Sequence, residues 1–168
     1  MKELILGGAR SGKSHYAQEL ATNSALPVVY IATATAEDEE MFARIEKHKA
    51  DRPSDWKIVE EPVSLALILQ QEASQNKFII VDCLTLWLTN LIGLKQNTFM
   101  QEKENFLKVL PQLTGNMVFV SNEIGMGVVP MSSMGRKFRD ELGWLHQKVA
   151  SLCDRVTLMT AGISVKIK

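Results

Sequence analysis

The stretch that decides the fold lies near the amino terminus, at residues 2–14, KELILGGARSGKS. Its apolar run breaks at a pair of glycines, and a helical pattern resumes near Lys13. Gly7 and Gly12 have the spacing that lets the backbone turn tightly and aim successive N–H groups at phosphate oxygens, next to the positive end of the following helix. Lys13 would reach the outer phosphates, and the Ser14 hydroxyl would ligate Mg²⁺. The stretch therefore predicts a nucleoside triphosphate site, and the alternative is an ordinary glycine-rich turn.

The composition predicts one globular domain, residues 1–168. The chain is 46% hydrophobic and 23% charged, with nineteen basic and nineteen acidic residues, so we expect a sizeable core and no nucleic acid as a general partner. The first apolar run is short and the longest one, 83–94, contains polar residues, so we expect neither a signal peptide nor a membrane span. Cys83 and Cys153 match no metal-ligand spacing, which indicates reduced thiols in a cytoplasmic protein.

Strands and helices alternate along the chain, which predicts an α/β fold. After the first strand, apolar runs predict strands at 28–32, 78–82, 116–121 and 154–160, with a short edge strand at 163–168. Helical patterns occupy residues 13–23, 37–49, 62–69, 84–94, 97–111 and 136–152. Since strand, helix and strand in succession imply a parallel pair with a right-handed crossover, we expect a mostly parallel sheet flanked by helices.

Ligands of open parallel sheets bind at the carboxyl ends of the strands, and three predicted strands end in suitable residues. Asp82 ends the run FIIVD, where its carboxylate would hold Mg²⁺ beside the phosphate-binding loop, directly or through water. Residues 33–36, TATA, leave the strand at 28–32, where small side chains would suit close approach to a ligand. Glu123 follows the strand at 116–121 and could orient a metal-bound water or a substrate hydroxyl. The alternatives are turn and capping roles for all three.

One histidine falls on an apolar helix face. Met41, Ile45 and His48 are spaced i, i+4, i+7 in the predicted helix at 37–49. From spacing alone, His48 is most simply a partly buried residue at a helix end. A cluster of His48, Lys49 and Arg52 is nonetheless what a nucleotide phosphate would need.

Several segments together resemble one known family, and the resemblance runs from end to end. They are residues 7–14 (GGARSGKS), 30–33 (YIAT), 48–53 (HKADRP), 82–85 (DCLT), 121–127 (SNEIGMG) and 161–162 (AG). The phosphate-binding loop is shared by many families, but the His-Lys-x-x-Arg-Pro and Asn-Glu-x-Gly-Met-Gly patterns are specific. The chain resembles the bifunctional adenosylcobinamide kinase / adenosylcobinamide-phosphate guanylyltransferase of cobalamin synthesis.

The resemblance implies a RecA-like P-loop fold, a homotrimer and two reactions. First, the terminal hydroxyl of the aminopropanol arm of adenosylcobinamide is phosphorylated from ATP or GTP. GMP from GTP then passes through a covalent histidine intermediate to that phosphate, which yields adenosyl-GDP-cobinamide and pyrophosphate. The implied partners are thus the corrinoid and nucleoside triphosphates, with Mg²⁺ as cofactor.

Carried onto this chain, the resemblance implies that His48 is the guanylylated catalytic residue and that Ser14 and Asp82 hold the metal. Nucleotide contacts are implied for the loop and for a second set of residues: Gly7, Gly8, Ala9, Arg10, Ser11, Gly12, Lys13, Ser14, Ile31, Ala32, Thr33, Lys49, Ala50, Asp51, Arg52, Glu60 and Asp82. The chain departs from the family pattern at His146, where Asn is expected before Gln147, and the position of Asp82 is Glu in some members.

Two other functions fit the same residues without the resemblance. One is a different small-molecule kinase, with the same loop and Asp82 and with His48 purely structural. The other is a nucleotide-binding switch or assembly ATPase, in which Glu123 positions water and a partner protein receives the signal. Stoichiometric attachment of GMP to the protein would distinguish the guanylyltransferase from the first alternative. Intrinsic hydrolysis without corrinoid-dependent turnover would favour the second.

Overall fold

The strands form one mixed sheet with the phosphate-binding loop near its middle. The computed structural model describes residues 1–35 and 53–168, and within them seven strands pair in the order β3-β2-β4-β5-β1-β6-β7. β7 runs antiparallel to β6, and the other neighbours pair in parallel. The strand bounds are β1 Lys2–Gly7, β2 Val28–Ala32, β3 Lys57–Glu60, β4 Phe78–Asp82, β5 Asn116–Asn122, β6 Arg155–Thr160 and β7 Ile163–Lys166.

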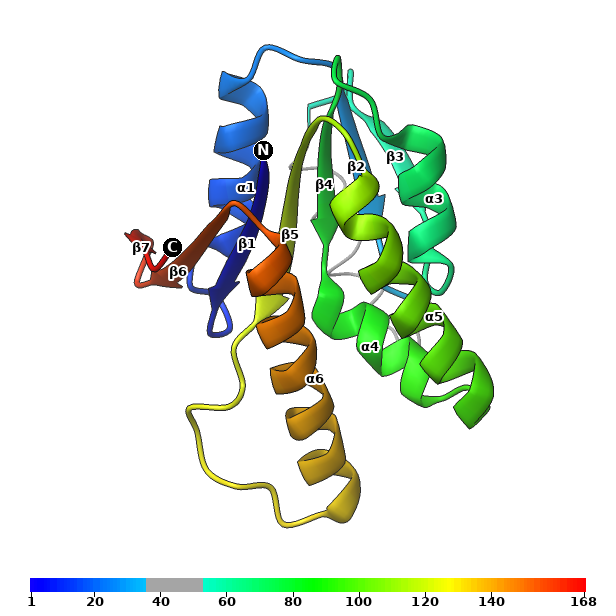
Figure 1. Ribbon diagram of the computed structural model, residues 1–168. Coiled ribbons are helices and arrows are strands. Elements are labelled where there is room, and N and C mark those ends of the chain that lie inside the picture. The colour runs from blue at the N-terminus through cyan, green and yellow to red at the C-terminus, as the bar shows by residue number, and fades with distance from the viewer. Residues whose placement is uncertain (36–52) are drawn as a thin grey trace.

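Helices cover both faces of the sheet (Figure 1). α1 (Lys13–Asn23) packs on one face, and the other face carries α3 (Leu65–Glu72), α4 (Leu84–Ile92), α5 (Gln96–Val109) and α6 (Ser133–Leu152), with a 3-10 turn at Leu110–Gln112 after α5. Among the described residues, no helix combines the length and the apolar character needed to cross a bilayer. The mostly parallel sheet between two helical layers confirms the predicted α/β fold.

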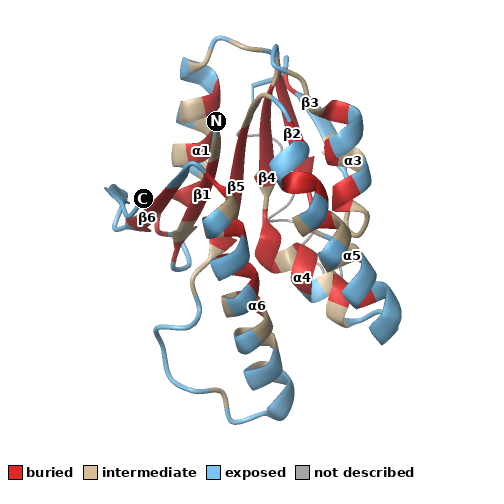
Figure 2. Ribbon diagram, in the orientation of Figure 1, coloured by how far each residue is buried: buried red, intermediate tan, exposed pale blue. Residues whose placement is uncertain are grey.

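Side chains that alternate along the strands supply two separate cores. Leu4 packs into the larger core under α3 to α6, while the next residue, Ile5, packs against Ala17 and Ala21 of α1. Because helices cover the central strands on both faces, these strands read as continuous apolar runs, and Figure 2 shows them buried along most of their length. Trp87 lies in the core under α3 to α6, where its ring packs edge-on against the ring of Phe106 with the two centroids 5.1 Å apart.

The sequence does not predict β3, which pairs with β2 at one edge of the sheet. Its four residues are exposed or half-exposed, so they carry no apolar alternation. A buried carboxylate ties β3 to the layer behind it: Glu72 of α3 accepts hydrogen bonds from Lys57 and, at 3.0 Å, from Lys77. These two hydrogen bonds lower the pKa of Glu72, and the bond from Lys57 contributes most. Ion pairing rather than apolar burial therefore helps to hold this edge strand.

Two helix starts also differ from the prediction. The helix expected from residue 62 begins at Leu65, because the Glu61 carboxylate accepts hydrogen bonds from the N–H groups of Val63 and Ser64 at 2.9 and 2.7 Å. α6 begins at Ser133, three residues earlier than expected, because the Ser132 side chain caps it by accepting from the N–H of Gly135 at 3.1 Å.

The predicted helix at 37–49 lies outside the described residues. The same holds for five residues with implied site roles: His48, Lys49, Ala50, Asp51 and Arg52.

Candidate nucleotide-binding site

The loop that joins β1 to α1 is supported closely by its neighbours. A Cβ atom on Gly7 would lie 2.5 Å from the carbonyl oxygen of Met159 on β6 and 2.5 Å from the Ser11 hydroxyl. Gly12, at φ 97°, precedes α1 in the left-handed conformation that favours glycine. Gly162, in the turn between β6 and β7, donates its N–H to the Ser11 carbonyl at 3.0 Å. The segment 161–162, which carries part of the family resemblance, therefore supports the phosphate-binding loop from outside.

The side chains under this loop are arranged to meet an anion. Lys13 is only 7% exposed, and its Nζ donates to the carbonyl of Gly8 at 2.7 Å. Burial lowers the pKa of Lys13, and the nearby charge of Asp82 opposes that shift. The Ser11 hydroxyl is buried and has no hydrogen-bond partner among the described residues. Since buried polar groups are normally paired, phosphate oxygens are suitable partners for both side chains.

Asp82 lies at the carboxyl end of β4, and a buried tyrosine orients it. The hydroxyl of Tyr30 on β2 donates to Asp82 Oδ2 at 2.7 Å, and the Tyr30 ring stacks on Trp56 with centroids 6.5 Å apart. This hydrogen bond limits the rotation of the carboxylate. The sequence does not predict this role of Tyr30, although the residue lies in the segment YIAT.

We expect Tyr30→Phe to raise the Mg²⁺ concentration needed for half-maximal activity by about 10-fold, because hydrogen bonds behind a metal ligand commonly contribute that much to affinity. Phe keeps the ring and its stacking on Trp56, so the melting temperature should change little. Titration of activity with Mg²⁺ measures the effect. An unchanged Mg²⁺ requirement would show that Asp82 is oriented without the tyrosine.

The oxygens at this edge suit Mg²⁺ rather than a softer metal. The Ser14 hydroxyl and the Asp82 carboxylate are hard oxygen donors, and Mg²⁺ is usually held by one or two protein ligands together with water and substrate phosphates. In residues 1–35 and 53–168, no group of three or more His, Cys, Asp and Glu side chains is arranged to hold a metal ion. A few protein ligands beside a phosphate-binding loop fit a metal that arrives with its nucleotide.

The other implied nucleotide contacts lie along the same edge of the sheet. Ile31 and Thr33 are fully buried, and the Thr33 hydroxyl donates to the carbonyl of Cys83 at 2.7 Å. The Asn90 side chain donates to the Thr33 carbonyl at 2.8 Å, so this segment is held from β4 and α4. Glu60 ends β3 opposite Ala32. The structure thus brings residues 31–33, Glu60, Asp82 and the loop to one edge, and their nucleotide contacts stay a prediction.

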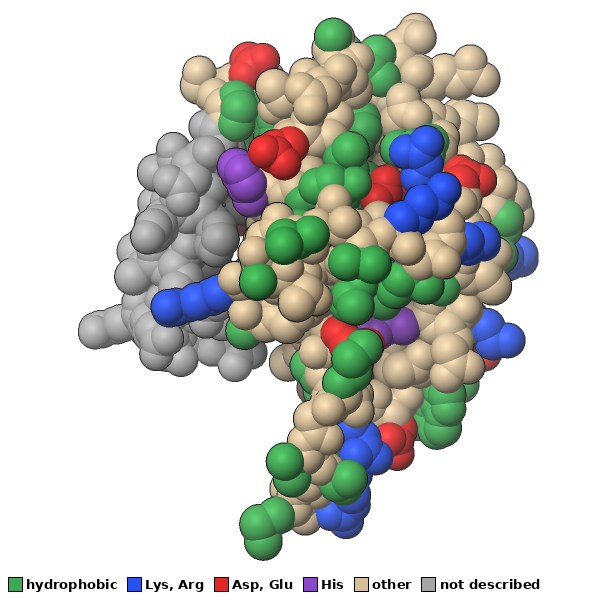
Figure 3. Space-filling view, turned by 90° about the vertical axis from the view of Figure 1, so that its left-hand side faces the viewer, with side chains coloured by type: hydrophobic (Ala, Val, Ile, Leu, Met, Phe, Trp, Pro, Cys, Tyr) green, Lys and Arg blue, Asp and Glu red, His purple; other side chains and the backbone are tan. Residues whose placement is uncertain are grey.

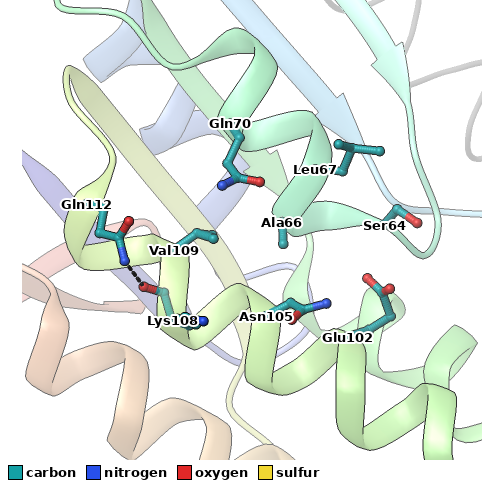
Figure 4. Close-up of a pocket in the computed structure, with 9 residues that line it drawn as sticks. All are labelled: Ser64, Ala66, Leu67, Gln70, Glu102, Asn105, Lys108, Val109 and Gln112. Carbon is teal, nitrogen blue, oxygen red and sulfur yellow. Dashed lines mark hydrogen bonds between the residues drawn. The ribbon is translucent and has the colours of Figure 1, made fainter.

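A groove elsewhere on the surface does not belong to this site. It lies between α3 and α5, has a volume of about 420 Å³ and is lined by Ser64, Ala66, Leu67, Gln70, Glu102, Asn105, Lys108, Val109 and Gln112 (Figure 4). Burial raises the pKa of Glu102, and the nearby charge of Glu61 makes a smaller contribution in the same direction. None of these residues comes from the phosphate-binding loop or from β4, so we do not assign the nucleotide to this groove.

Comparison with solved structures supports the same fold. A structure from Pyrococcus horikoshii OT3 matches with a TM-score of 0.57 and 14% identity, over 99% of this chain and 85% of the other. The RadB recombinase matches with a TM-score of 0.51 and 13% identity, over 94% and 73%. At these identities the likeness concerns architecture alone, and it confirms the expected P-loop fold.

Sequence comparison identifies the family. The model of "cobinamide kinase / cobinamide phosphate guanyltransferase" matches residues 3–167. The bifunctional adenosylcobalamin biosynthesis protein CobP of Pseudomonas aeruginosa is 50% identical over all of this chain and 98% of its own length. The corresponding protein CobU of Escherichia coli is 36% identical over the whole of both chains. The chain therefore belongs to the cobinamide kinase / cobinamide phosphate guanyltransferase family of enzymes in cobalamin biosynthesis.

Proposed function

We propose that this enzyme first phosphorylates the aminopropanol hydroxyl of adenosylcobinamide from ATP or GTP. It then transfers GMP from GTP to that phosphate, which yields adenosyl-GDP-cobinamide and pyrophosphate. The observation that carries the proposal is the family match over residues 3–167, on a chain whose buried Lys13 and tyrosine-bonded Asp82 meet at one edge of the sheet.

In the kinase step, residues 7–14 bind the triphosphate through backbone N–H groups, and Lys13 balances the charge of its outer phosphates. Ser14 and Asp82 would hold Mg²⁺, which supplies further neutralisation of the phosphate oxygens. Catalysis of this kind depends mostly on positioning and charge, because phosphoryl transfer needs little covalent chemistry from the protein.

In the transferase step, His48 is the proposed nucleophile. Its imidazole attacks the α-phosphorus of GTP, an N–P bond forms, and the bond to the departing pyrophosphate breaks. The corrinoid phosphate then attacks the same phosphorus and frees the imidazole. Lys49 and Arg52 would balance charge on the phosphate oxygens.

Covalent labelling tests the transferase step. Incubation with Mg²⁺ and GTP labelled at the α-phosphate should attach GMP to the wild-type enzyme through an acid-labile, alkali-stable bond. His48→Ala should lose the label and keep the kinase reaction. His15→Ala serves as the matched control, because the His15 side chain is 76% exposed on α1 and should leave labelling intact. Labelling that survives His48→Ala, or an acid-stable bond, would contradict His48 as the nucleophile. Absence of label on the wild-type enzyme would leave a kinase without guanylyltransferase activity.

We also propose a homotrimer in the cytoplasm. The segment after β5 projects from the body of the protein, and apolar side chains line it in Figure 3. Val128 and Met131 are 94% and 99% exposed there, which is unusual for a surface that meets only water. Cys83 and Cys153 are buried free thiols, in keeping with a reducing compartment. Light scattering should give three times the 18.8 kDa chain mass, and a monomer mass would contradict the trimer.

A further inference from the structure

Glu123 lies between the two strands that carry the nucleotide-binding groups. It follows β5, which pairs with β1 on one side and with β4 on the other. At the carboxyl end of β5, Asn122 is in register with Gly7 of the phosphate-binding loop. The backbone N–H of Glu123 donates to the Gly7 carbonyl at 2.9 Å. The backbone of Glu123 is therefore fixed relative to the start of the loop.

The Glu123 side chain points to the side of the sheet opposite Asp82. Ser121, two residues earlier and thus on the same side of β5, contacts α4 and α6 through its hydroxyl. Asp82 is bonded instead to Tyr30, which packs in the core under α1. A phosphate bound over the strand ends would lie between these two carboxylates, with the metal-binding group on one side and Glu123 on the other.

A buried chain of polar groups stands behind Glu123. The Nδ1 atom of His146 lies 3.7 Å from Glu123 Oε2, and its Nε2 lies 2.7 Å from the Ser121 hydroxyl. That hydroxyl is 3.1 Å from the Thr85 hydroxyl, which accepts from the N–H of Asn122 at 2.7 Å. Because Thr85 accepts there, it can donate to Ser121, Ser121 can donate to Nε2, and the Nδ1 hydrogen of a neutral His146 then faces Glu123.

The state of His146 suits this arrangement. The residue is only 7% exposed, and burial lowers its pKa, opposed by the charge of Glu123. A neutral imidazole can direct its Nδ1 hydrogen toward the Glu123 carboxylate and orient it without placing a positive charge beside it. Glu123 Oε1 also accepts from the N–H of Gly125, and the side chain stays 20% exposed, which leaves access for a substrate.

Other carboxylates at this edge have different surroundings. Asp82 accepts from Tyr30, and Glu61 accepts from the N–H groups of Val63 and Ser64. Glu60 ends β3, which β2 and β4 separate from β5. Among the described residues, Glu123 is thus the carboxylate best placed to face a group that approaches the phosphates from the α4–α6 side.

We propose that Glu123 is the catalytic base of the kinase step and that His146 is its positioning residue. Glu123 accepts the proton of the acceptor hydroxyl while the hydroxyl oxygen forms a bond to the γ-phosphorus. The bond from that phosphorus to the bridging oxygen breaks, and the nucleoside diphosphate leaves with the electron pair. This assignment rests on the proposed function, because it needs an alcohol as phosphate acceptor.

Glu123→Gln tests the base. The substitution keeps the size of the side chain and an acceptor for Gly125, so we expect the kinase kcat to fall on the order of 10²–10⁴-fold, with the KM for nucleotide nearly unchanged. Labelling of the protein by GMP removes no hydroxyl proton and should proceed at the wild-type rate. A kinase kcat within about 10-fold of wild type, which general-base loss should exceed, would overturn the assignment. If the wild-type enzyme phosphorylates no corrinoid at all, the proposed function fails, and the base assignment fails with it.

His146→Leu and His146→Asn test the positioning role. Leu removes the N–H that faces Glu123, and we expect the kinase kcat to fall about 10-fold at unchanged nucleotide KM, as for a modest misplacement of a reacting group. Asn restores a donor and should recover most of the rate. In the Glu123→Gln background, His146→Leu should add no further loss, because its effect acts through Glu123. If the loss of kcat in the double variant were the sum of the two single losses, His146 would have a purely structural role. The same would hold if kcat of His146→Leu fell only in proportion to the folded fraction measured by thermal unfolding.

Discussion

Replacement of Lys13 by Met should lower kcat/KM for corrinoid phosphorylation on the order of 10³-fold, the scale on which single charged or polar groups stabilise a phosphoryl or acyl transition state. Met has nearly the same length but no charge, so it fills the same buried space under the loop. Lys13 now donates to the Gly8 carbonyl at 2.7 Å. A bound triphosphate would offer this ammonium a stronger, charged acceptor. Coupled measurement of diphosphate release and of phosphorylated corrinoid would quantify the loss.

Stability should not follow activity in this variant. Burial lowers the pKa of Lys13, which means that the fold disfavours the charged ammonium relative to water. Removing the charge should therefore leave the free energy of unfolding within about 1 kcal/mol of wild type. Lys148→Met, at an exposed position on α6, is the matched control and should retain both activity and stability. A fall in activity of less than 10-fold, well below the expected loss, would exclude Lys13 from the phosphate site.

The predictability of the central strands followed their burial. β4 was expected at 78–82 and β5 at 116–121, and the structure has them at Phe78–Asp82 and Asn116–Asn122, because layers on both faces demand an unbroken apolar run. β3 has exposed or half-exposed residues, so hydrophobic pattern carries no signal for it. Its pairing with β2 and the bond from Lys57 to Glu72 are both contacts between separate segments.

The candidate site divides in the same way. Residues 7–14 and Asp82 are recognisable because a phosphate-binding loop and an apolar strand ending in a carboxylate are local patterns. The groups behind them are not local: Tyr30 and Asp82 are 52 positions apart, and Ser121 and His146 are 25 apart. Their contacts depend on strand order and on which face each helix covers. A polar side chain in a core position, such as His146, was the signal available in the sequence, and it could not specify the partner.

Gly7→Ala should destabilise the protein by about 3 kcal/mol, the upper end of the usual cost of overpacking, and should abolish nucleotide binding. The new Cβ would lie 2.5 Å from the carbonyl oxygen of Met159. That oxygen is backbone on β6, in register with Gly7 itself, so relief of the contact requires a shift between two paired strands. Denaturant titration measures the stability loss, and calorimetry with a non-hydrolysable GTP analogue measures binding.

The adjacent glycine separates this cause from chain flexibility. A Cβ on Gly8 would have no heavy atom within 4 Å, so Gly8→Ala should stay within about 0.5 kcal/mol of wild type in stability. Both substitutions restrict the unfolded chain equally, so that contribution cancels in the comparison. The difference between the two variants reports the close contacts of the Gly7 position with β6 and Ser11, together with its backbone angle. Equal stability of the two variants would mean that β1 and β6 can move apart at the start of the loop. The close support of the phosphate-binding loop by the carboxyl-terminal hairpin would then have no energetic role.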